Sequence, residues 1–210
     1  MASFENAGSG AMVRKVAAAV VENRAWLSEI DGKIGDGDHG NNMAKGFGRA
    51  AERISDGDTL DAAFATVTDV LMGEIGGSMG PLYGMFFSDM ADVVAGKERI
   101  DAPTFAAMLA AGAEGVMTIG EARPGDKCLL DALCPAVTAA EETAAQGFPE
   151  TLAAVRKAAT DGRDATVDMV AQIGRASRLG ERSRGVQDAG ATSCALILVT
   201  LADAIEARLS

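Results

Sequence analysis

The sequence predicts an all-α protein of about eight helices that forms a single domain over residues 1–210. Aromatic residues make up 4% of the chain, prolines number five and alanine is abundant, a profile that favours helices over strands. Apolar residues recur at three- and four-residue spacing, and no stretch alternates cleanly with period two. The sequence has no internal repeat or linker-like tract, so we expect one domain.

Composition and charge exclude several classes of function. With 48% hydrophobic and 23% charged residues, the chain resembles an ordinary soluble globular protein. Its net charge of −11 argues against nucleic-acid binding, which depends on clustered lysine and arginine. That charge also repels anions at long range, so a phosphate site would need metal ions and local donors. Three cysteines without a CxxC pair, no signal-like N-terminus and no long apolar run predict a cytoplasmic protein with free thiols and no membrane span.

Each expected helix lies between glycine, proline or polar breaks. The first covers residues 12–30 and carries Asp31 at its C-terminal end. Its apolar stripe, which we expect to be buried, consists of Val13, Val16, Val20 and Leu27. Further helices are expected over residues 43–54, 60–71, 81–93, 103–120, 129–140, 149–173 and 191–209.

Two of these helices have alternative interpretations. Either a continuous helix or one split or kinked at Asp161-Gly162 is compatible with residues 149–173. Residues 194–201 have the valine, isoleucine and leucine content of a strand. The absence of glycine and proline from residue 191 to residue 210 favours a helix there instead.

The segment from Asp31 to Met43 has the densest concentration of potential ligands. Its thirteen residues include three carboxylates, the only histidine, two asparagines and four glycines. Magnesium prefers a few carboxylate oxygens together with water and substrate phosphates. Asp36 and Asp38 flank a glycine, so a tight turn can direct both toward one point, and Asp31 can approach from the other side. We therefore expect Asp31, Asp36 and Asp38 to form a magnesium site that holds phosphates.

The remaining polar residues of this segment have functional and structural interpretations. Asn41 or Asn42 can cap the next helix, whose N-terminus would favour a phosphate. His39, between Asp38 and Gly40, is expected to be a phosphate donor or a neighbour of the metal. The alternative is an ordinary polar turn with solvated charges. An EF-hand loop does not fit, because position twelve, counted from Asp36, is a phenylalanine rather than glutamate.

Three further glycine-rich breaks lie at residues 76–80, 120–127 and 174–190. Several glycines in one loop exceed what a helix connection requires, and they indicate backbone amides that approach a ligand. Ser78 adds a hydroxyl suited to a phosphate or ribose, although a helix-capping loop is the alternative. Neither a GxxxxGK[ST] nor a GxGxxG motif is present. Met43 and Met79 are candidates to line an adenine pocket.

The only basic cluster of this acidic chain lies near its C-terminal end. It consists of Arg175, Arg178, Arg182 and Arg184. One or two of these arginines can bind phosphates in a bidentate manner or stack on a base. The alternative is a solvated face that forms salt bridges with Glu181 and Asp188.

Five motifs together identify a known family. In order, residues 34–43, 76–84, 124–127, 174–183 and 187–192 read IGDGDHGNNM, GGSMGPLYG, PGDK, GRASRLGERS and QDAGAT. This series closely resembles the L subunit, or nucleotide-binding domain, of dihydroxyacetone kinases, and it spans nearly the whole chain. The resemblance implies an eight-helix antiparallel barrel with the nucleotide at one end.

The resemblance also implies the roles of individual residues. Two Mg²⁺ ions would be held by Asp31, Asp36 and Asp38. ADP or ATP would be surrounded by His39, Gly40, Asn41, Asn42, Ser78, Met79, Gly120, Leu129, Arg175, Asp188 and Gly190. Two positions depart from the family pattern: Ser78-Met79 replaces a small residue followed by serine or threonine, and Leu129 replaces the methionine of some relatives. These changes would move a hydroxyl contact and slightly alter the base pocket.

The implied activity requires a partner. In the family, a histidine on a separate K subunit or domain binds the ketose covalently, and this chain has no second histidine for that purpose. The chain would therefore present the phosphoryl group rather than bind the sugar. Phosphoryl transfer depends on positioning and charge neutralisation, so no catalytic nucleophile is expected, only assistance from the magnesium ligands and His39.

Two family versions differ in the phosphoryl donor. In one, ATP exchanges as a substrate; in the other, ADP stays bound and is rephosphorylated by an M-type phosphocarrier of the phosphotransferase system. A chain of this length without a fused K domain favours the second. The ketose, dihydroxyacetone or a tetrulose, and a homodimeric state are left open. Alternatives are the nucleotide domain of a fatty-acid kinase, whose chains are much longer, and a non-catalytic nucleotide-binding regulator.

Overall fold

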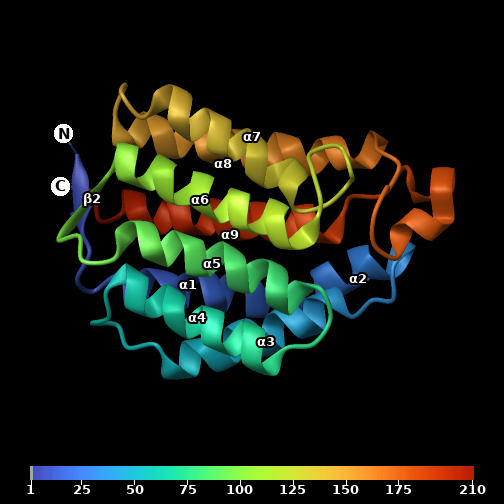
Figure 1. Ribbon diagram of the computed structural model, residues 1–210, viewed down its shortest axis with the longest axis horizontal. Coiled ribbons are helices and arrows are strands. Elements are labelled where there is room, and N and C mark those ends of the chain that lie inside the picture. The colour runs from blue at the N-terminus through green and yellow to red at the C-terminus, as the bar shows by residue number, and fades with distance from the viewer. Residues whose placement is uncertain (1) are drawn as a thin grey trace.

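The computed structural model describes residues 2–210 and confirms that the chain is predominantly helical (Figure 1). The α-helices are α1 (Gly10–Glu22), α2 (Arg24–Ile34), α3 (His39–Arg53), α4 (Leu60–Glu74), α5 (Met79–Val94), α6 (Ala102–Gly120), α7 (Leu130–Thr143), α8 (Phe148–Ala165) and α9 (Ala189–Glu206). Two 3₁₀ segments, η1 (Thr166–Asp168) and η2 (Ala176–Ser183), lie between α8 and α9.

The helices pack side by side along the longest axis of the molecule (Figure 1). Contacts between neighbours run from α1 to α3 and then in order through α4, α5, α6, α7, α8 and α9, and α9 returns to α1. The short helix α2 contacts α3 and α9 at one end of this cycle. Such a closed cycle is compatible with the barrel that the resemblance implies, which stays a prediction.

The centre of the bundle is apolar and well packed. Phe47, Phe64, Phe86 and Phe87 are all at most 1% exposed, and their rings meet Tyr83 and one another at centroid distances of 5.2–6.5 Å. Tilted and edge-to-face aromatic pairs of this kind are favourable beyond the area they bury. The expected stripe is confirmed as buried at Val13, Val16, Val20 and Leu27.

A small sheet pairs the N-terminal strand with a segment from the middle of the chain, and no pattern in the sequence predicted it. Strand β1 (Ser3–Glu5) pairs antiparallel with β2 (Arg99–Asp101), with Phe4 opposite Ile100. Three residues are too few to display period-two alternation. The last residue also bonds to the first strand, because the amide of Ser210 donates to the carbonyl of Ser3 at 3.1 Å. Both termini therefore lie at the same end of the bundle (Figure 1).

The expected first helix is in fact two helices. Asn23 separates α1 from α2 with φ −90° and ψ 10°, outside the α-helical region, and its side-chain amide donates to the carbonyl of Ala19 at 2.8 Å. This local bond competes with helix continuation, which is typical of asparagine. Asp31 consequently lies within the last turn of α2 rather than beyond it. Helix α3 begins at His39, so Asp38, not Asn41 or Asn42, occupies the N-cap position.

The helix expected over residues 149–173 ends at Ala165, and it passes through Gly162 without a break. A Cβ atom on Gly162 would lie 2.2 Å from the carbonyl oxygen of Asp131, so glycine is present because α7 and α8 approach closely. The final segment is the expected helix, α9, and not a strand.

Two helices, α6 and α9, are long and apolar enough to cross a membrane by composition alone. In the bundle, 67% of the α9 window and 50% of the α6 window are buried. Such burial is what core helices of a folded domain show, because a helix that is apolar all round can be covered by its neighbours.

Replacing Gly162 tests the close contact of α7 with α8. Gly162→Ala should lower the free energy of unfolding by about 1–3 kcal/mol, because the methyl group meets a backbone carbonyl that cannot move aside. Gly73→Ala is the matched control: it also lies in a helix, and no atom lies within 4 Å of the added Cβ. That control should raise stability by about 0.5–1 kcal/mol. Urea unfolding measures both, and equal shifts would contradict the packing argument.

Candidate functional site

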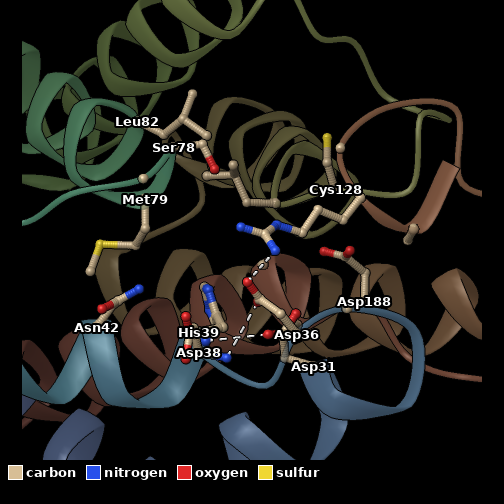
Figure 2. A pocket seen from close by; sticks show the side chains of 18 of the residues that line it. Asp31, Asp36, Asp38, His39, Asn42, Ser78, Met79, Leu82, Cys128 and Asp188 are labelled. Atoms are coloured by element: carbon tan, nitrogen blue, oxygen red, sulfur yellow. Dashed lines mark hydrogen bonds and ion pairs between the residues drawn. The ribbon is translucent and has the colours of Figure 1, made fainter. Parts of the chain in front are cut away.

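A cavity of about 430 Å³ opens at the end of the bundle opposite the chain termini. This volume lies in the range of small-molecule sites. Its wall comes from segments far apart in the sequence: residues 31–42, 76–83, 127–129, 173–176 and 188–190. Figure 2 shows side chains from these segments directed toward one another across the opening.

Four helices begin at this cavity. Helices α3, α5 and α9 start at His39, Met79 and Ala189, which all line it, and α7 starts one residue after Leu129, which lines it as well. The first turn of a helix has free N–H groups and a partial positive charge, so it favours phosphate. Several helix starts together supply the local donors that an acidic chain needs to hold an anion.

In three of these helices the second residue is a glycine, and its small size allows the helix to begin close to neighbouring segments. A Cβ on Gly40 would lie 2.1 Å from the carbonyl oxygen of Arg24, and one on Gly80 would lie 2.4 Å from that of Ile75. A Cβ on Gly190 would lie 3.0 Å from a carboxylate oxygen of Asp188. A larger residue at any of these positions would push the start of that helix away from its neighbours.

All three predicted metal ligands, Asp31, Asp36 and Asp38, line the cavity. The backbone amide of His39 donates to Asp31 at 3.3 Å, and the amide of Asp38 donates to Asp36 at 3.5 Å. Gly35 leaves room for the Asp31 carboxylate, because a Cβ there would lie 2.4 Å from Oδ1. These bonds hold the carboxylates along one side of the cavity (Figure 2).

The carboxylates fit magnesium by their chemistry. Within residues 2–210, no three aspartate, glutamate, histidine or cysteine side chains converge as a ready-made metal cage. Asp36 is instead paired with the guanidinium of Arg175, whose Nη1 lies 2.5 Å from Oδ2. Magnesium commonly uses only one or two protein carboxylates together with waters and phosphates, so a closed cage is not required. The metal role of the three aspartates remains a prediction.

His39 belongs to a polar network that reaches into the core. Its Nε2 lies 2.9 Å from the Ser193 hydroxyl, which lies 2.6 Å from the Tyr83 hydroxyl. Tyr83 also donates to the carbonyl of Gly190 at 3.2 Å. Burial lowers the pKa of His39 and raises that of Tyr83 well above its usual range, so both rings are neutral near pH 7. The network fixes the orientation of the imidazole at the start of α3.

The opposite wall contains a second polar group. Asp188 accepts a hydrogen bond from the amide of Ala191 at 2.7 Å, which caps α9, and burial raises its pKa to about 7. Lys127 is 2% exposed, and burial lowers its pKa. Cys128 lies beside it, 8% exposed, and burial raises the pKa of its thiol to about 12.

Most of the predicted site residues meet at this cavity. Its lining includes Asp31, Asp36, Asp38, His39, Asn42, Ser78, Met79, Leu129, Arg175, Asp188 and Gly190. Three predicted nucleotide contacts lie outside the lining: Gly40, Asn41 and Gly120. Gly40 packs against α2, Asn41 is exposed on α3, and Gly120 packs beside Leu82.

For two groups of predicted site residues, the methionines and the clustered arginines, the structure places only one member at the cavity. Met43 is fully buried in the core, whereas Met79 lines the cavity, so only the second is placed to contact a base. Among the four clustered arginines, only Arg175 lines the cavity. Arg184 pairs with Glu181 at 3.1 Å, as the alternative interpretation held.

Several lining residues were not among the expected site residues. They are Ile34, Leu82, Tyr83, Lys127, Cys128 and Ile173. Tyr83 and Lys127 lie in the quoted motifs, so the motifs were a signal that could have identified them. Ser193, which bonds His39 from α9, lies just outside the last motif, so no such signal identified it.

Comparison with known proteins gives consistent matches. Residues 33–203 match the DAK2 domain family. The chain is 33% identical to the PEP-dependent dihydroxyacetone kinase 2, ADP-binding subunit DhaL, of Listeria innocua, over 93% of each chain. It is 36% identical to the corresponding ADP-binding subunit of Escherichia coli, over 84% of this chain and 86% of that protein. L-erythrulose kinase of Pectobacterium atrosepticum is 35% identical over 91% of this chain, which spans 33% of that longer protein.

Solved structures show the same fold. The native dihydroxyacetone kinase of C. freundii superposes with a TM-score of 0.69 at 27% identity, over 92% of this chain and 34% of that one. The structure of that kinase in complex with AMP-PNP and Mg²⁺ superposes with a TM-score of 0.67 at 26% identity. The chain therefore spans about a third of the length of this solved kinase.

Thiol reactivity tests the enclosed wall of the cavity. Because burial raises the pKa of Cys128 to about 12, and raises the pKa values of Cys134 and Cys194 as well, thiolate is scarce at pH 8. DTNB should modify the native protein at least about 100-fold more slowly than the guanidinium-unfolded chain. Comparison with a Cys128→Ala variant identifies the part of the DTNB reaction that comes from Cys128, the thiol that lines the cavity. Reaction of Cys128 at the unfolded rate would contradict its enclosed position.

Proposed function

The chain belongs to the DAK2 domain family, and from that premise we propose that it is the nucleotide-binding subunit of a kinase for dihydroxyacetone or a similar small ketose. The relatives that match over most of their own length are named ADP-binding subunits of dihydroxyacetone kinases. One structural observation carries the proposal: three aspartates and the starts of four helices meet at one cavity.

The cavity offers separate surfaces for the parts of a nucleotide. The helix starts and Ser78 provide donors for phosphate oxygens. Met79, Leu129 and Ile173 provide an apolar surface for a base. These donors and apolar groups line the same cavity, so a nucleotide can contact both at once.

Asp31, Asp36 and Asp38 are the residues that would hold magnesium, and two ions are expected from the family resemblance. Bound magnesium neutralises phosphate charge and favours phosphoryl transfer. Arg175 would then exchange its partner from Asp36 to a phosphate oxygen. That exchange costs little, because the Arg175 side chain is 70% exposed and an exposed ion pair contributes at most about 1 kcal/mol.

The residues of this chain position the phosphoryl group and provide no acceptor for it. His39 is neutral and tied to Ser193, so it is suited to orient a phosphate contact rather than to attack. We propose that the acceptor ketose is held on a separate K subunit, and that an M-type phosphocarrier rephosphorylates bound ADP in place. Action in the cytoplasm fits these partners, and we infer no role for nucleic acid or a membrane.

An ATP-dependent ketose kinase is the second candidate. It is favoured by matches of 34–35% identity to longer chains named erythrulose kinases. Identity alone does not separate the candidates, because the ADP-binding subunits match at 33–38%. The difference lies in whether the nucleotide remains bound between turnovers.

Nucleotide content of the freshly purified protein separates the two candidates. We expect near-stoichiometric ADP, released by heat and identified by chromatography, because enclosure between several helix starts and magnesium slows release. An empty protein that binds Mg-ATP reversibly would favour the ATP-dependent kinase instead. Failure to bind either nucleotide with magnesium present would contradict nucleotide binding altogether.

Replacing one predicted metal ligand tests the enzymatic role. Asp36→Asn should reduce phosphoryl transfer to the ketose, assayed with the partner subunits, by about 100-fold or more. It removes a charge from the predicted magnesium site while keeping the size of the side chain. Asp69→Asn, at an exposed position on α4, is the control and should leave transfer unchanged. Full activity in Asp36→Asn would show that the metal assignment is wrong.

A further inference from the structure

A buried lysine joins the two ends of the loop that carries the cavity arginine. This loop, residues 169–183, is called here the arginine loop because it contains Arg175, Arg178 and Arg182. The Lys127 ammonium donates to the carbonyl of Met169 at 3.1 Å and to the carbonyl of Ser183 at 2.5 Å. One side chain outside the loop therefore contacts both of its ends.

The backbone at Lys127 adopts an unfavourable conformation in the turn that directs its side chain toward the loop. Its φ of 62° lies in the left-handed region, which costs a non-glycine residue on the order of 1 kcal/mol. Asp131 stabilises this turn, because its carboxylate accepts from the amide of Gly125 at 2.5 Å and from the amide of Cys128 at 2.7 Å. These two bonds flank Lys127 and direct its side chain inward.

Other bonds complete the base of the arginine loop, whereas its tip contacts α2 and pairs with Asp36. The amide of Ala171 donates to the Ser183 hydroxyl at 2.9 Å, and the amide of Gln172 donates to the carbonyl of Asp126 at 3.0 Å. Ala171 and Ser183 are buried, whereas Arg175 and the residues that follow it are exposed or half-buried. The position of the tip therefore depends on the buried base as well as on these exposed contacts.

The tip brings Arg175 across the cavity to Asp36, which belongs to the segment that follows α2. A guanidinium reaches a phosphate only from a defined backbone position, since its bidentate geometry is directional. A displacement of the base would move Arg175 away from the aspartate side of the cavity, together with Ile173, Gly174 and Ala176, the other loop residues that line it.

We propose that Lys127 is a positioning residue for the nucleotide site: it anchors both ends of the arginine loop and so places Arg175 opposite Asp31, Asp36 and Asp38. The effect on nucleotide affinity rests on the proposed function, whereas the effect on the loop does not. The two parts are therefore tested by separate measurements.

The first measurement uses the arginines of the loop as reporters. Trypsin cleaves after arginine, and mass spectrometry of the fragments identifies which bond is cut. In the nucleotide-free protein, Lys127→Met should be cleaved within residues 175–182 at least about 10-fold faster than the wild type, because local opening governs proteolysis. The matched control is Lys157→Met, which removes an exposed lysine paired with Asp161 and should be cleaved as the wild type.

An unchanged rate of loop cleavage would contradict the proposal in either of two variants of Lys127. Unchanged cleavage within the arginine loop of Lys127→Met would overturn it. If Lys127→Met is digested throughout the chain, because the whole domain has lost stability, Lys127→Gln replaces it. The glutamine amide is neutral and shorter, so loop cleavage should again exceed the wild-type rate, and an unchanged rate would overturn the proposal.

The second measurement is a double-mutant cycle on Mg-ADP affinity, measured by calorimetry. Arg175→Ala should weaken binding about 10-fold or more, and Lys127→Met should weaken it about 10-fold. The double variant should lose clearly less affinity than the product of the two single losses, because part of the effect of Lys127 passes through Arg175 and the rest through the other lining residues of the loop. If the loss of Mg-ADP affinity in the double variant equals the product of the two single losses, the two residues act independently, and the proposal is overturned. A wild-type protein that binds no ADP would contradict the proposed function, while trypsin cleavage still decides the anchoring of the loop.

Discussion

The close approach of several helix starts is the constraint on which the cavity depends. A chain with a net charge of −11 cannot attract a polyanion at long range, so the favourable charge has to be local. It comes from the first turns of the helices that begin at the cavity. Glycines at positions 40, 80 and 190 allow three of these helix starts to pack closely against their neighbours. The sequence therefore uses its glycines for packing at the site as much as for turns.

The fold was predictable where the information is local. Apolar spacing and glycine breaks located most helices, and the absence of glycine and proline identified α9 as a helix. The division at Asn23 was missed because asparagine gives a weaker break signal than glycine or proline, and it acts through a single side-chain bond. The Asp161-Gly162 pair did not break α8, because the close contact with α7 favours a continuous glycine-containing helix there. A local side-chain bond thus decided the first position, and tertiary packing decided the second.

The site was predictable to the extent that its chemistry is concentrated in short motifs. Asp31, Asp36, Asp38 and His39 were apparent from composition alone, since few structural turns contain so many ligands. Tyr83 lies in a motif, but its bond with Ser193, 110 positions away, became apparent only in the structure. Lys127 is similar, because a lysine in a polar motif appears solvated until the structure shows two carbonyls at its ammonium. Long-range hydrogen bonds leave no periodic trace in a sequence.

The two-stranded sheet has a consequence for how this domain can be built into larger proteins. Strand β1 and the bond from Ser210 to Ser3 hold both chain ends together, at the end of the bundle far from the cavity. Adjacent termini at a surface are the geometry that permits gene fusion and circular permutation. A linker attached to either end would leave the cavity mouth free to meet another protein. This geometry is compatible with relatives of both lengths, one of which the chain covers to 93% and another to 33%.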